Sequence, residues 1–143
     1  MRIVIAADHG GFRLKGTIAK ALQAAGHEVT DLGASSAEPI DYPDYAHQVA
    51  RAVADRTYDR GILVCGTGVG MAMAANRHAG VRAVNCSDTF TARFSRSHND
   101  ANVLTLGERV VGPGLAQDIV DLWLATPASL DERHVKRVAK IDG

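Results

Sequence analysis

The sequence feature with the clearest chemical potential is a cysteine followed at once by a glycine-rich turn. Cys65 ends the short apolar run Ile62–Val64, and a run of good helix formers begins at Met71. The turn between them consists of Gly66, Thr67, Gly68, Val69 and Gly70. Glycines let a backbone approach a ligand closely, and unpaired N–H groups before a helix point toward negative charge. Because such surroundings favour the thiolate form of cysteine, the pattern predicts an anion site with a reactive thiol at its mouth.

The same stretch has two plainer interpretations. A lone cysteine at a strand end is often a small core residue. The turn also partly matches the dinucleotide-binding fingerprint G-x-G-x-x-G. Its third glycine is missing, because Met71 stands at that position. In favour of nucleotide binding, Asp88 lies about where the fingerprint places the acid that binds the ribose. The stretch by itself therefore leaves core packing, nucleotide binding and catalysis open.

Further polar groups with chemical potential occur elsewhere in the chain. Asp8 and His9 offer a carboxylate and an imidazole before a pair of glycines, although an aspartate there is also a typical helix N-cap. His98, followed by Asn99, offers an acid–base group with an amide to orient hydroxyls, or simply a polar turn.

A basic segment near the C-terminus suggests phosphate binding. Arg133 and Arg137 are spaced i and i+4, so both guanidinium groups lie on one helix face and suit the oxygens of a phosphate. A solvated basic face is the alternative, and Arg109 has the same ambiguity. The six histidines show neither i,i+4 pairing nor a Cys-x-x-Cys partner, so the sequence predicts no metal site.

Composition narrows the class of protein. A chain of 143 residues fits one domain, residues 1–143, with a real core. Its 16 basic and 16 acidic residues cancel and only 5% of residues are aromatic, which argues against nucleic-acid and membrane partners. There is no long apolar run, and two cysteines without a signal peptide suggest the reducing cytoplasm.

The elements that must position these groups alternate along the chain. Strands are expected at 2–7, 27–32, 62–64, 81–85 and 102–106. Helices are expected at 12–25, 42–54, 71–76, 88–97, 113–124 and about 130–141. This order predicts an α/β fold, a three-layer α/β/α sandwich with a five-stranded, mostly parallel, Rossmann-like sheet. Ligands bind at the carboxyl ends of strands in such sheets, which is where Asp8, Cys65 and Asp88 are expected, whereas the place of His98 depends on its loop.

Several spaced motifs together resemble one family, the ribose-5-phosphate isomerases of type B, which also includes galactose- and allose-phosphate isomerases. The matching segments are 8–12 (DHGGF), 14–15, 41–43, 61–70 (GILVCGTGVG), 74–76, 82–84, 97–103 (SHNDANV), 107–112 (GERVVG), and Arg133 and His134 with Arg137. They run from the first strand to the last helix. Some members use a glutamate after the glycine turn; here Met71 stands at that position, which places the sequence in the cysteine class.

The resemblance implies a reaction and a role for each motif. It implies interconversion of ribose 5-phosphate and ribulose 5-phosphate through an enediolate, without metal or organic cofactor. Cys65 resembles the base at C2, His98 the group that opens the furanose ring, and Thr67 a group that orients the thiol or moves a proton. The implied substrate-binding residues are Asp8, His9, Gly66, Thr67, Gly68, Val69, Gly70, Asn99, Arg109, Arg133 and Arg137. The phosphate is expected near His9, Arg133 and Arg137.

The resemblance also implies a homodimer or homotetramer with sites built across the interface. Two alternatives to the pentose-phosphate isomerase stay open at this point. One is an isomerase of a six-carbon sugar phosphate such as allose or galactose 6-phosphate. The other is a non-catalytic binder of sugar phosphates or nucleotides.

Overall fold

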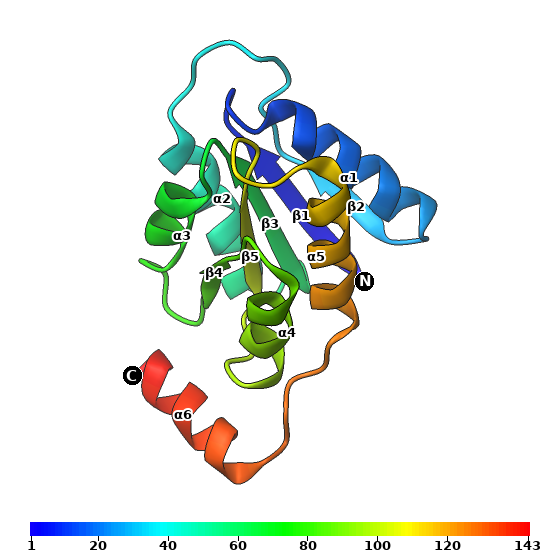
Figure 1. Cartoon of the computed structure of the whole chain (residues 1–143). Coiled ribbons are helices and arrows are strands. Elements are labelled where there is room, and N and C mark those ends of the chain that lie inside the picture. The colour runs from blue at the N-terminus through cyan, green and yellow to red at the C-terminus, as the bar shows by residue number, and fades with distance from the viewer.

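The computed structural model describes all residues from 1 to 143 and forms an α/β sandwich (Figure 1). The strands are β1 (Arg2–Ala7), β2 (Glu28–Asp31), β3 (Arg60–Cys65), β4 (Ala83–Asn85) and β5 (Val103–Gly107). The helices are α1 (Phe12–Ala24), α2 (Tyr42–Ala54), α3 (Val69–Ala75), α4 (Thr89–Ser97), α5 (Pro113–Ala125) and α6 (Glu132–Asp142). No helix of the chain has both the length and the apolar character to cross a membrane.

The five strands form one sheet in the order β2-β1-β3-β5-β4, and every neighbouring pair is parallel. The sequence predicted a mostly parallel sheet; it is entirely parallel because a helix crosses over between every pair of consecutive strands. The chain moves from β1 outward to β2 and then to the other side of β1 with β3. The strand order therefore reverses between β1 and β3, which is where open α/β sheets bind ligands.

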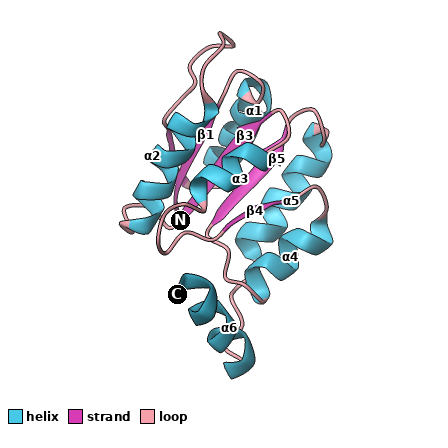
Figure 2. Cartoon of the chain, turned by 90° about the vertical axis from the view of Figure 1, so that its left-hand side faces the viewer, coloured by secondary structure: helices cyan, strands magenta, loops and turns pink.

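Two hydrophobic clusters fill the space between the sheet and its helices. On one face, Ile3, Ile5, Ile62 and Val64 pack against α1, α4 and α5. On the other face, Val4, Leu63 and Cys65 pack against α2 and α3. Alternate residues of each strand face opposite clusters, as strand geometry requires, so both faces of the sheet are buried and the three predicted layers are confirmed (Figure 2).

Local sequence signals explain where several helices begin and end. α1 is followed by Gly26 at a positive φ of 88°, and the N–H of His27 donates to the carbonyl of Leu22, the usual glycine-terminated helix end. Pro43 lies in the first turn of α2. Asp88 caps α4, since its side chain accepts from the N–H of Thr91.

The last helix stands apart from the body of the molecule. α6, red in Figure 1, lies beyond the amino edge of the sheet, at the opposite end from the loops that follow β1 and β3 (Figures 1 and 2). Arg82 holds its end, donating to both carboxylate oxygens of Asp142 at 3.0 and 2.9 Å. Its exposed apolar residues include Val135 and Ile141, with Leu130 just before it.

Candidate active site

Three loops meet at the carboxyl edge of the sheet, beside the point where the strand order reverses. The N–H of Asp8, after β1, donates to the carbonyl of Val64 at 3.2 Å. After β5, the N–H of Glu108 donates to the carbonyl of Cys65 at 2.9 Å, and the N–H of Arg109 to that of Gly66 at 3.1 Å. The structure thus brings Asp8, the cysteine turn and Arg109 together, as the sequence predicted for the first two.

Close backbone approach explains the glycines between these loops. A Cβ on Gly10 would lie 3.1 Å from the backbone nitrogen of Gly66, and one on Gly107 would lie 2.7 Å from the backbone of Thr67. Gly11 has no room for a Cβ either, because the backbone of Val64 occupies that space. Larger residues would push the three loops apart, so these glycines set the spacing of the site.

Cys65 lies at the centre of this arrangement. Its side chain is buried at the end of β3, and its Sγ accepts a hydrogen bond from the N–H of Gly68 at 3.0 Å. The hydroxyl of Thr67 accepts from the N–H of Val69 at 3.3 Å. The N–H groups of Gly66 and Thr67 donate to no group of the chain. A sulfur that accepts a hydrogen bond is suited to carry negative charge, and the free donors are suited to hold an oxyanion.

Asp8 and His9 flank the cysteine turn on the β1 side. Asp8 is buried, and its Oδ1 accepts from the N–H of Gly10 at 2.8 Å. His9 is exposed, and its Nδ1 accepts from the N–H of Ile40 at 3.3 Å, so the loop that follows β2 is tied to the histidine. Arg109 is also exposed, with its guanidinium 3.5 Å from where a Cβ of Gly66 would lie. A carboxylate, an imidazole and a guanidinium therefore lie on the loops that flank the cysteine turn.

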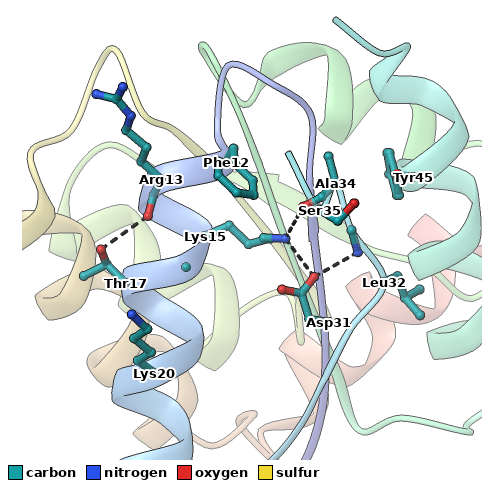
Figure 3. A pocket seen from close by; sticks show the side chains of 12 residues that line it. Phe12, Arg13, Lys15, Thr17, Lys20, Asp31, Leu32, Ala34, Ser35 and Tyr45 are labelled. Carbon is teal, nitrogen blue, oxygen red and sulfur yellow. Dashed lines mark hydrogen bonds and ion pairs between the residues drawn. The ribbon is translucent and has the colours of Figure 1, made fainter. Parts of the chain in front are cut away.

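A cavity of about 730 Å³ lies between α1 and the segment from the end of β2 into the loop that follows it (Figure 3). The buried ammonium of Lys15 donates there to the carboxylate of Asp31 at 2.8 Å and to the carbonyl of Ala34 at 2.7 Å. Exposed Arg13 and Lys20 extend from α1 along the same wall. None of the site residues predicted from the sequence lines this cavity, and the Lys15 contacts hold the start of the loop that reaches His9.

His98 and Asn99 lie at the opposite edge of the sheet. His98 is the C-cap of α4, which follows β4 and returns to the amino edge. The loop after it ends beside the start of β3, where the N–H of Gly61 donates to the carbonyl of Asn102 at 3.0 Å. Gly61 lies four positions before Cys65 on β3, which is roughly 13 Å along a strand. Within one chain, His98 therefore does not reach the cysteine turn.

The His98 ring stacks on another histidine at this edge. The rings of His98 and His134 are nearly parallel, at 9°, with centroids 4.2 Å apart. Burial lowers the pKa of His134, and the nearby charges of His98 and Arg133 lower it further. The neutral form of His134 is thus favoured beside His98.

The predicted phosphate-binding arginines also lie on this side. Arg133 and Arg137 project from α6, where they line an open basic recess with Lys136 and Lys140. Both arginines are exposed. Their guanidinium groups share one face, as the spacing predicted, but His9, the third predicted phosphate ligand, is at the other edge of the same chain.

The remaining reactive groups have structural explanations. Asp88, weighed as a ribose-binding acid, is a helix cap, and its hydrogen bonds to Thr91 lower its pKa. Cys86 is buried in the core, where burial raises the pKa of its thiol to about 12. No cluster of three or more His, Cys, Asp or Glu side chains is arranged to hold a metal ion.

The family model described as ribose/galactose isomerase matches residues 3–141. The chain belongs to this family. Ribose-5-phosphate isomerase B of Escherichia coli is 52% identical over 140 residues, 98% of this chain and 93% of that protein. The solved structure of Clostridium thermocellum ribose-5-phosphate isomerase B has a TM-score of 0.97 at 51% identity, covering 99% of this chain and 95% of that one. The structure of the Mycoplasma genitalium enzyme with bound ribulose-5-phosphate has a TM-score of 0.94 at 41% identity, covering 99% and 93%.

Membership of the ribose/galactose isomerase family confirms the resemblance read from the motifs, and the all-parallel sheet confirms the fold class. The roles of individual residues stay predictions. The structure divides the predicted site residues into two groups, one at the carboxyl edge of the sheet and one at the amino edge.

Sequence reasoning missed residues that support the cysteine turn. The carboxylate of Glu108 accepts from the N–H of Leu14 at 2.9 Å and so ties the β5 loop to the start of α1. Thr105 and Asn85 donate to carbonyl oxygens of the turn. Of these residues, only Thr105 could have been noticed in the sequence. It is a polar residue in the middle of an otherwise apolar buried strand, where a polar side chain needs a hydrogen-bond partner.

Proposed function

We propose that the chain is a ribose-5-phosphate isomerase that interconverts D-ribose 5-phosphate and D-ribulose 5-phosphate. The observation that carries the proposal is the meeting of a buried thiol, free backbone donors and Asp8 at the carboxyl edge of the sheet. The family and the identity of about one half with named ribose-5-phosphate isomerases support the same reaction. Both cysteines are free thiols, which fits a place in the reducing cytoplasm.

The chemistry assigns each group of the cysteine turn a step. The Cys65 thiolate takes the proton from C2 of the open-chain aldose and returns it to C1, which moves the carbonyl from C1 to C2. The N–H groups of Gly66 and Thr67 hold the negative oxygen of the enediolate between these steps, an effect worth about 3–4 kcal/mol per well-placed donor. The Thr67 hydroxyl moves the proton between O1 and O2, and Asp8 binds sugar hydroxyls.

We also propose that the active site is completed by a second copy of the chain. His98 opens the furanose ring, Asn99 orients hydroxyls and the two α6 arginines bind the phosphate with His9, but one chain holds these groups at opposite edges. A second copy related by two-fold symmetry resolves the separation, since each then supplies its amino edge to the partner's cysteine turn. Exposed apolar side chains support this arrangement, because Met73 on α3 and Val135 and Ile141 on α6 are each more than half exposed.

The decisive experiment measures conversion of ribose 5-phosphate to ribulose 5-phosphate by the purified protein, with and without EDTA. We expect turnover that EDTA does not change, and its loss in Cys65→Ala, since general bases contribute about 10²–10⁴-fold. Cys86→Ala is the matched control, because that thiol lies in the core on the other face of the sheet. Full activity of Cys65→Ala would contradict its role as the base.

The same preparation separates the alternatives. Turnover of allose 6-phosphate or galactose 6-phosphate in place of ribose 5-phosphate would identify a six-carbon isomerase. Tight calorimetric binding of ATP or NAD without any isomerase activity would identify a non-catalytic nucleotide binder. The capping role of Asp88 disfavours the nucleotide interpretation, because its carboxylate is already engaged by Thr91.

A further inference from the structure

We propose that Asn85 and Thr105 are positioning residues that brace the cysteine turn from the sheet. Each holds one peptide group of the turn by its carbonyl oxygen, while the N–H of that same peptide contacts a side chain to which chemistry is assigned. The inference rests on the roles proposed above for Cys65 and Thr67.

The first brace acts on the peptide between Thr67 and Gly68. The Nδ2 of Asn85 donates to the carbonyl oxygen of Thr67 at 3.3 Å. The N–H of Gly68, in the same peptide, donates to the Sγ of Cys65 at 3.0 Å. Because a trans peptide is planar and its C=O and N–H point in opposite directions, holding the oxygen also aims the N–H at the sulfur. Asn85 thus fixes the hydrogen bond that stabilises negative charge on Cys65.

The second brace acts on the next peptide. The buried hydroxyl of Thr105 donates to the carbonyl oxygen of Gly68 at 2.8 Å. The N–H of Val69, in the same peptide, donates to the hydroxyl oxygen of Thr67 at 3.3 Å. By the same planarity, Thr105 fixes the donor that orients the hydroxyl of Thr67.

Sheet register explains why the two braces work together. Asn85 and Thr105 are directly paired residues of β4 and β5, and strand alternation turns them to the face covered by α2 and α3. Cys65 faces the same side from β3. The amide oxygen of Asn85 lies 3.3 Å from the hydroxyl oxygen of Thr105, so the two side chains are neighbours, while the single hydroxyl proton of Thr105 is donated to Gly68.

The conformation of the turn makes such support necessary. Gly68 has a φ of +81°, a left-handed conformation that glycine adopts freely but does not prefer over others. A turn with three glycines among five residues has many conformations available, and catalytic groups must be held to within a fraction of an ångström. The braces select the one conformation in which both N–H groups reach their side chains.

The test of the first brace measures alkylation of Cys65 by iodoacetamide across a range of pH, with the labelled peptide quantified by mass spectrometry. Asn85→Leu keeps the size of the side chain and removes its donor. We expect it to slow alkylation of Cys65 at neutral pH by about 5- to 10-fold. Cys86 does not interfere, because burial raises the pKa of its thiol to about 12.

The test of the second brace compares Thr105→Val with Thr105→Ser. We expect Thr105→Val to lower kcat for ribose 5-phosphate by about 5- to 10-fold with little change in KM, and Thr105→Ser to restore it. Thr126→Val is the matched control, because it removes a hydroxyl bond to the carbonyl of Leu122 at the end of α5, away from the turn. We expect that control to leave kcat unchanged.

Unchanged alkylation of Cys65 in Asn85→Leu, or full kcat in Thr105→Val, would overturn the corresponding brace. Asn85 is exposed, so its variant remains informative even where Thr105→Val fails to fold. Alkylation of Cys65 can be measured without turnover. If the wild-type protein has no isomerase activity, the proposed function is rejected, but the alkylation of Asn85→Leu still shows whether Asn85 braces the turn.

Discussion

At the scale of single residues, the site depends on the conformation of one glycine. Gly68 combines a positive φ of 81° with close contact to the amide of Asn85, whereas Gly80 has a φ of 77° and open space around it. Alanine at either position would suffer backbone strain, but only at Gly68 would it also collide with a neighbouring side chain. Comparing the two variants therefore distinguishes the effect of strain from the effect of steric contact.

We predict that Gly68→Ala loses about 100-fold in kcat/KM, because the new Cβ displaces the braced turn and small misplacements are costly. Gly80→Ala should keep full activity. Strain from the left-handed conformation should cost both variants about 1–2 kcal/mol in the free energy of unfolding, measured by urea titration. Equal activity of the two variants would show that the position of the turn does not matter for turnover.

The arginines of α6 carry a second residue-scale prediction. If Arg137 binds the substrate phosphate, Arg137→Gln should lower kcat/KM by about 10- to 100-fold, mainly through KM, since it removes charge-assisted hydrogen bonds. Lys20→Gln removes one exposed positive charge from α1 and serves as the charge-matched control. An equal effect of the two variants would indicate general electrostatic attraction rather than a phosphate contact.

At the scale of elements, a pair of histidines joins α2 to the turn that follows α3. The Nδ1 of His47 lies 2.8 Å from the Nε2 of His78, a hydrogen bond that requires a neutral nitrogen on one ring. Burial lowers the pKa of His78, and the charges of His47 and Arg51 lower it further. This pair holds α3, which begins within the cysteine turn, against α2.

The sign of the resulting pH dependence follows from that lowered pKa. Below about pH 6.5 the unfolded chain protonates His78 more readily than the folded chain does, so the free energy of unfolding falls as the pH drops through this range. Above that pH both states are neutral and the pair adds no slope. Urea unfolding between pH 5 and 8 should show this decline, reduced in His78→Gln. An unaltered decline in that variant would assign it to other groups.

The elements were also the part of the structure most accessible from sequence. The short apolar runs predicted all five strands of the sheet. The position predicted for His98 depended on the conformation of its loop. Connectivity alone places it at the amino edge, because a helix that follows a parallel strand must return to that edge before the next strand. The Asn85 and Thr105 contacts were inaccessible, because they depend on the pairing of β4 with β5, and the sequence does not specify strand order.

At the scale of the whole molecule, the proposed site has two halves contributed by two chains. Cys65→Ala destroys the half at the carboxyl edge and His98→Ala the half at the amino edge, so each variant alone should be inactive. In a mixed dimer of the two, one site receives both damaged halves and the other receives both intact halves. Denaturing and refolding the two variants together should therefore restore activity.

Random pairing in such a two-fold dimer would give about a quarter of the wild-type activity per chain. The measurement is turnover of ribose 5-phosphate after co-refolding equal amounts, with each variant refolded alone as the control. A co-refolded mixture of Cys65→Ala with Cys65→Ala,His98→Ala should stay inactive, because no pairing there contains an intact cysteine. If the co-refolded mixture stays inactive, Cys65 and His98 do not meet across an interface. Because the two lie at opposite edges of the sheet within one chain, that result would exclude a joint role for them.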